Sequence, residues 1–196
     1  MREKYSPVFF GIMLGFLTLL YAEFLASTFG IYEANITGAL YEEALEHTAG
    51  ETVKDHEKES DLPGVVFKDR EEAKKVASKA WEYLMRAHIH GEGMGAIALI
   101  LSLLIGHSLL KNKFKKILSI MVGFGGFAYP LCWFYAGTYM VDKGKEAARA
   151  DVHILALSSV TFYLAGLGIV FVLLLLNHFF RDIPPVRFFF EKELKP

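Results

Sequence analysis

The chain has 196 residues, of which 53% are hydrophobic, and its formal net charge is −1. A soluble domain of this size has about 45–50% apolar residues, and here the apolar residues are gathered into long runs. The single cysteine excludes an intrachain disulfide, and the composition excludes a disordered or fibrous protein. The sequence therefore predicts an integral membrane protein.

Four apolar runs are each long enough to cross a bilayer, and they cover residues 8–29, 87–110, 117–140 and 152–180. A helix needs roughly 20 residues to cross about 30 Å of hydrocarbon. Backbone polar groups in lipid must bond within their own segment, which favours helices over strands. The first run is as long as a full span and carries Glu23, so we interpret it as a retained helix rather than a signal peptide. We expect an all-α integral membrane four-helix bundle.

Residues 31–86 form the longest polar segment, and we expect a helical extracytoplasmic cap there, between the first and second spans. Residues 31–47 have the pattern of a short amphipathic helix, and residues 49–64 are rich in helix breakers. A second helix begins after Asp69, a good N-cap residue, with Glu71 and Glu72 in its first turn. The predicted division is residues 1–30 as the first span, 31–86 as the cap, 87–180 as the other three spans and 181–196 as a cytoplasmic tail.

The distribution of basic residues predicts the orientation. Arg2 and Lys4 precede the first span, and the loop at residues 111–116 holds four lysines and no acid. The tail at residues 181–196 is also basic, whereas residues 31–87 hold thirteen acidic and eight basic residues. Lysine and arginine are enriched in the cytoplasmic flanks of membrane spans, so both termini are predicted to lie in the cytoplasm. The expected location is the inner (plasma) membrane of the cell.

Histidines mark the ends of the second and fourth runs. Ionisable residues within membrane segments are costly and by default indicate function. Two of these histidines lie near the basic inner flanks, and three lie near the outer ends of the same two runs. In chain order they are His88, His90, His107, His153 and His178.

This layout resembles that of small four-helix membrane cytochromes of the b type. The resemblance implies two imidazoles that clamp one haem iron, with one or two haem b groups in the chain. His88 or His90 would pair with His153 at the outer haem, and His107 would pair with His178 at the inner one. The implied activity is electron transfer between a quinone and an acceptor or redox partner protein near the outer face, as in a membrane oxidoreductase.

Helix geometry supports this arrangement on one helix only. His153 and His178 are 25 residues apart and share a face of an ideal helix, whereas His88 and His107 differ by about 100°. Glycines in the second, third and fourth runs could leave room for a macrocycle, but we favour the interpretation that they allow close helix packing.

Two other hypotheses remain open. Glu23, His88, Glu92 and His153 could converge near the outer face and hold an iron or copper ion, as in a membrane metalloenzyme. Alternatively, the histidines are interfacial, and the chain is a non-catalytic complex subunit, a homo-oligomer or a small transporter whose acidic cap docks a partner. The lipid bilayer is an expected partner under every hypothesis, and the sequence shows no nucleic-acid-binding motif.

Overall fold

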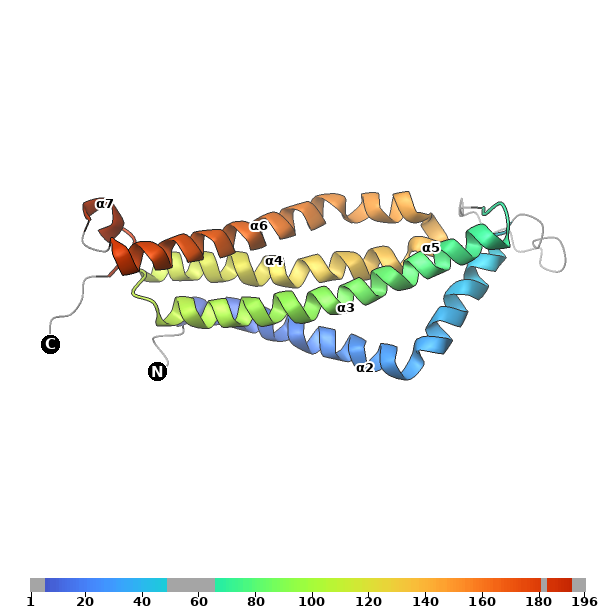
Figure 1. The fold of residues 1–196 in the computed structure, drawn as a ribbon, viewed down its shortest axis with the longest axis horizontal. Helices are drawn as coiled ribbons and strands as arrows, with labels where there is room; N and C mark the ends of the chain where they lie inside the picture. The colour runs from blue at the N-terminus through green and yellow to red at the C-terminus, as the bar shows by residue number, and fades with distance from the viewer. Residues whose placement is uncertain (1–5, 49–65, 181–182, 192–196) are drawn as a thin grey trace. The chain divides into compact units, whose positions relative to one another are not determined.

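A computed structural model describes residues 6–48, 66–180 and 183–191, and these residues are almost entirely helical (Figure 1). The elements are η1 (Ser6–Val8), α2 (Phe9–Glu46), α3 (Arg70–His107), α4 (Asn112–Thr138), α5 (Met140–Lys143), α6 (Lys145–Phe179) and α7 (Pro184–Arg187). The described ranges contain no strand, so the predicted all-α class is confirmed.

Helices α2, α3, α4 and α6 are the four that are long and apolar enough to cross a membrane, which confirms the four predicted runs. Helices α2 and α3 have 38 residues each, and α3, which has no interruption, is about 57 Å along its axis, well beyond the roughly 30 Å of a hydrocarbon core. The second run was predicted to extend to residue 110, but α3 ends at His107. The fourth run, in contrast, ends at Phe179, within one residue of its prediction.

The described parts of the predicted cap are the second half of α2 and the first half of α3. Helix α2 comprises two helices joined across a kink, and the second, which ends at Glu46, matches the short helix predicted at residues 31–47. The one departure from helical dihedrals is at Tyr32 (φ −117°, ψ 17°), where α2 bends (Figure 1). The breaker-rich residues 49–64 lie outside the described residues.

Asp69 caps α3 as the sequence predicted. The backbone N–H of Glu72 donates to Asp69 Oδ1 at 2.8 Å, and the Glu72 carboxylate accepts from the backbone N–H of Lys68 at 2.8 Å. These two bonds satisfy the backbone N–H groups of Lys68 and Glu72 at the helix start, which fixes where α3 begins.

The chain divides into two compact units, each built from parts of the long helices. The first unit comprises residues 1–21, 90–129 and 157–196. Close backbone contacts hold its described helices together. A Cβ atom on Gly125 of α4 would lie 2.5 Å from the Ser159 carbonyl oxygen of α6, and one on Gly15 of α2 would lie 2.8 Å from the Leu99 nitrogen of α3. Glycine is therefore required at both crossings, as expected for helices that pack in lipid.

The second unit comprises residues 22–89 and 130–156. Aromatic rings join its helices: Phe29 of α2 meets Trp81 of α3, and Tyr83 of α3 meets Trp133 of α4, with centroids 5.0 and 4.8 Å apart. Gly144 links α5 to α6 with a φ of 77°, a conformation that favours glycine.

Candidate functional site

Helix α3 presents His88 and His90 to different neighbours. Two residues along a helix correspond to a rotation of about 200°, so the two imidazoles leave α3 on nearly opposite sides. His88 reaches α2 within the second unit, and His90 reaches α4 within the first. Both side chains are half-buried.

His88 is fixed by a backbone group of α2. Its Nδ1 atom lies 3.2 Å from the carbonyl oxygen of Ala22, which is fully buried. A carbonyl oxygen only accepts, so this hydrogen bond requires the proton on Nδ1, and in the neutral tautomer that makes it the lone pair is on Nε2. Histidines that bind metals commonly donate their other ring N–H to a backbone carbonyl, which sets the tautomer and the ring orientation.

His90 packs edge-on against Tyr129 of α4, with centroids 5.5 Å apart and an interplanar angle of 64°. Gly93 follows one turn later on α3, and a Cβ atom there would meet nothing within 4 Å. The α3 surface next to His90 is therefore open on the side of Gly93.

His107 and His178, in the first unit, are both exposed near the ends of their helices. His107 Nδ1 lies 3.0 Å from the carbonyl oxygen of Leu103, one turn earlier on α3. By the same argument as for His88, this bond leaves the lone pair on Nε2. The ring of His178 stacks edge-on against its neighbour Phe179, with centroids 4.6 Å apart.

The described residues give no support for the proposed metal set. Among the described residues, no three His, Cys, Asp or Glu side chains form a group that could hold a metal ion. Glu23 and His153 are exposed, whereas His88 and Glu92 are half-buried. Their expected position near the outer face does not by itself bring side chains of different helices together.

The glycines pack helices against each other rather than opening the interior. A Cβ atom on Gly166 would lie 2.8 Å from a methyl carbon of Val122, and Gly125 is held as closely against Ser159. This confirms the packing interpretation at these positions. A macrocycle held by the exposed histidines would therefore lie on a helix surface.

Arg86 lies in an aromatic setting that the sequence did not reveal. Its guanidinium carbon is 5.5 Å from the centroid of Tyr83 and 5.0 Å from that of Trp133, and its Nη2 donates to Glu82. Stacking over two rings lets the guanidinium stay near the start of an apolar run with its charge partly balanced.

The second unit holds another cationic group in contact with aromatic rings, Lys143 of α5. Its Nζ atom donates to Asp151 Oδ2 at 2.7 Å and to the Tyr135 hydroxyl at 3.1 Å. It also lies 5.5 and 5.3 Å from the ring centroids of Tyr135 and Tyr139. These hydrogen bonds raise the pKa of Lys143, and the hydrogen bond from Lys143 lowers the pKa of Asp151.

A short repeat in the sequence could have pointed to the settings of both Arg86 and Asp151. The string Arg86-Ala87-His88-Ile89-His90 on α3 resembles Arg149-Ala150-Asp151-Val152-His153 on α6, with three identical positions. It aligns His90 with His153 and His88 with Asp151.

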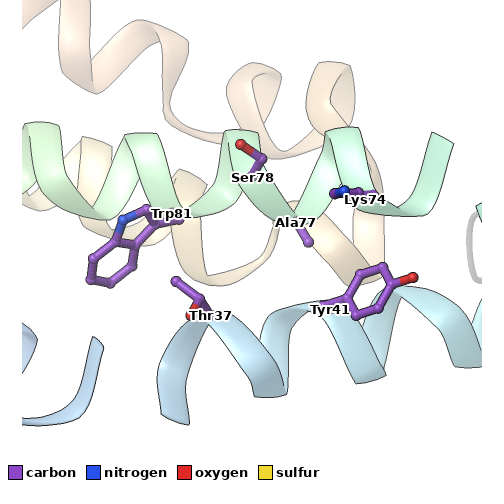
Figure 2. A pocket seen from close by; sticks show the side chains of 6 residues that line it. All are labelled: Thr37, Tyr41, Lys74, Ala77, Ser78 and Trp81. Carbon is purple, nitrogen blue, oxygen red and sulfur yellow. The ribbon is translucent and has the colours of Figure 1, made fainter. Parts of the chain in front are cut away.

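A cavity of about 350 Å³ opens in the second unit between α2 and α3, and none of the described histidines lines it (Figure 2). Its lining comprises Thr37, Tyr41, Lys74, Ala77, Ser78 and Trp81. Figure 2 shows the Trp81 ring at one end and the Tyr41 hydroxyl pointing away from it. The Thr37 hydroxyl donates to the Glu33 carbonyl oxygen at 2.8 Å, so its proton is used within α2.

Comparisons with protein-family models, with curated proteins and with solved structures find no match to this chain.

Proposed function

We propose that this chain is a membrane-embedded haem b protein that transfers electrons. The observation that carries the proposal is the contact between His88 Nδ1 and the Ala22 carbonyl oxygen, because it leaves the iron-binding nitrogen of a half-buried imidazole in its lone-pair form. The hydrogen bond between His107 Nδ1 and the Leu103 carbonyl oxygen requires the same tautomer. The donor chemistry therefore fits an axial haem ligand at two of the five histidines.

The residues have distinct roles in this proposal. His88 and His153, which belong to the same unit, would hold an outer haem, and His107 and His178, which share the other unit, would hold an inner one. A haem iron with two imidazole ligands supplies reversible one-electron transfer. The backbone carbonyls of Ala22 and Leu103 orient the imidazoles of His88 and His107. Since His107, His153 and His178 are exposed, one edge of each haem would face lipid or a partner.

The expected partners follow from the proposed orientation. In this orientation the chain lies in the inner membrane with both termini on the cytoplasmic side. A quinone in the bilayer is then the proposed donor, and an acceptor protein would meet the outer ends of the helices. Residues 31–87 carry thirteen acidic and eight basic residues, so a basic redox partner matches this side.

The proposal is tested by adding haem to the full-length chain in detergent and recording the Soret absorbance. Wild type should saturate at one or two haems per chain. We expect His153→Ala to remove one of them, and His47→Ala, on a histidine near the end of α2, to change nothing. Saturation that is identical in all three proteins would contradict the assigned ligands.

A second candidate function is that of a non-catalytic complex subunit, and one observation favours it. Glu23 lies within the first apolar run and yet is exposed on the surface of the chain. A carboxylate in a membrane segment normally faces protein or water, so a partner covering α2 would account for it. In that case the purified chain is colourless, and Glu23→Gln weakens assembly with the partner without altering the fold of the chain.

A further inference from the structure

The connection between α3 and α4 holds four lysines, but the structure gives them two different roles. Lys115 is buried, with 7% of its surface exposed, and its Nζ donates to the Gly106 carbonyl oxygen at 3.1 Å. It thereby satisfies a carbonyl in the last turn of α3. Lys111, Lys113 and Lys116 are exposed. Three of the four charges are therefore presented outward.

The C-terminal tail returns to this connection within the first unit. The backbone N–H of Lys111 donates to the Phe189 carbonyl oxygen at 3.0 Å, and that of Glu191 donates to the Leu109 carbonyl oxygen at 2.8 Å. The ring of Phe189 packs against Phe114 of α4, with centroids 5.1 Å apart. The tail is thus attached to the start of α4 rather than extended away from it, and α7 lies close by (Figure 1).

This attachment brings further cationic and apolar groups to the lysines. Arg187 is exposed, and Phe188 is 62% exposed, with the Nζ atom of Lys111 5.0 Å from its ring centroid. Phe180, just before the tail, and Ile183, within it, are 50% and 45% exposed. Residues 107–116 contain no acid, and the described tail contains one, Glu191. We call Lys111, Lys113, Lys116, Arg187 and Phe188 the basic–aromatic patch.

We propose that the basic–aromatic patch binds the headgroup of an anionic phospholipid in the leaflet next to the start of α4. Lysine and arginine beside a membrane span attract anionic lipid, and exposed phenylalanines provide an apolar surface for the adjoining acyl chain. One molecule with a phosphate next to a hydrocarbon chain matches both parts of the patch. The proposal is independent of haem, because it uses none of the histidines.

The test uses the full-length chain in a neutral detergent, with the thermal unfolding midpoint as the readout. We expect phosphatidylglycerol to raise the midpoint more than phosphatidylcholine does, and high salt to reduce the difference. In the double variant Lys113→Gln/Lys116→Gln the difference should be lost. It should persist in the matched control Lys74→Gln/Lys75→Gln, which removes two exposed lysines near the start of α3.

Two further arms separate the alternatives. Lys115→Met should lower the midpoint without lipid and keep the lipid difference, because Lys115 bonds to α3 rather than facing outward. Inorganic phosphate should not raise the midpoint; if it reproduces the full effect, the site binds free phosphate and the lipid assignment is wrong. An equal response to both lipids, or equal loss in the control, would also overturn the proposal. Retention of phosphatidylglycerol in native mass spectra provides a second readout that does not depend on stability.

Discussion

The Nδ1 atom of His88 lies 3.2 Å from the carbonyl oxygen of Ala22, so one hydrogen bond fixes an imidazole of α3 against the backbone of α2. This bond has a structural consequence, because it ties two helices together. It also has a chemical consequence, because it determines which ring nitrogen carries the lone pair. The two roles can be separated by substitution.

Asparagine can place an N–H donor close to the position of histidine Nδ1 but offers no imidazole to iron. We therefore expect His88→Asn to keep the free energy of unfolding close to wild type and to lose one haem. His88→Ala should lose both the haem and about 1 kcal/mol of stability, the usual contribution of such a hydrogen bond. Denaturant unfolding and haem titration on the same preparations check this. Equal stability of the two variants would show that the Ala22 contact contributes nothing.

Gly125 lies where α4 and α6 touch. Because a Cβ atom there would lie 2.5 Å from the Ser159 carbonyl oxygen and 2.7 Å from the Tyr163 nitrogen, the helices must move apart to admit one. We expect Gly125→Ala to lower the free energy of unfolding by about 1–3 kcal/mol. Gly168→Ala on α6 is the control, since a Cβ there meets nothing within 4 Å. If both variants unfold alike, the close crossing is not a determinant of stability.

The Lys143–Asp151 ion pair lies outside the predicted spans and should make stability depend on pH at both extremes. The pKa of Asp151 is lowered by its hydrogen bond from Lys143, so its contribution is lost as the pH falls through that lowered value. The pKa of Lys143 is raised, so its contribution is lost as the pH rises through that raised value. Asp151→Asn should therefore lower the unfolding midpoint at neutral pH and have no effect in strong acid. A pH-independent loss would assign Asp151 a purely steric role.

Glu43 and Asp142 form a carboxyl pair beyond the predicted spans, and the pH dependence expected for Glu43 is opposite to that of Asp151. Burial and then the neighbouring Asp142 raise the pKa of Glu43, and His47 Nε2 lies 3.8 Å from Asp142 Oδ1. A group with a raised pKa stabilises the fold in acid, and its contribution is lost as the pH rises through that value.

Glu43→Gln keeps a neutral hydrogen-bonding group, so it should raise the unfolding midpoint at pH 7 and change it little near pH 4. Glu33→Gln, on an exposed residue of the same helix, is the control and should show no such difference between the two pH values. A drop in the midpoint of Glu43→Gln at pH 7 would show that ionised Glu43 stabilises the fold instead.

The helices could be predicted because long apolar runs and the Asp69 cap are local signals. What could not be predicted is that the helix expected at residues 31–47 joins the apolar run directly, with a kink at Tyr32 and no intervening loop. The setting of Arg86 was also hidden, because its ring partner Trp133 is distant in sequence and only tertiary packing brings the two together.

The candidate site was predictable as a set of residues but not as an arrangement. Spacing along one helix correctly separates His88 from His90. Spacing says nothing of how α2, α3 and α6 are rotated about their own axes, and rotation decides that Glu23 and His153 face outward. For this reason the expected position of these residues near the outer face could not establish a metal cluster.

The most direct test of the account is an absorption spectrum of the detergent-purified chain, produced with haem supplied, in its oxidised and dithionite-reduced forms. Metal analysis of the same sample gives the stoichiometry. The account predicts a Soret band, sharp α and β bands on reduction, and one or two irons per chain. A folded protein with no Soret band, whether colourless or loaded with non-haem iron or copper, would contradict it.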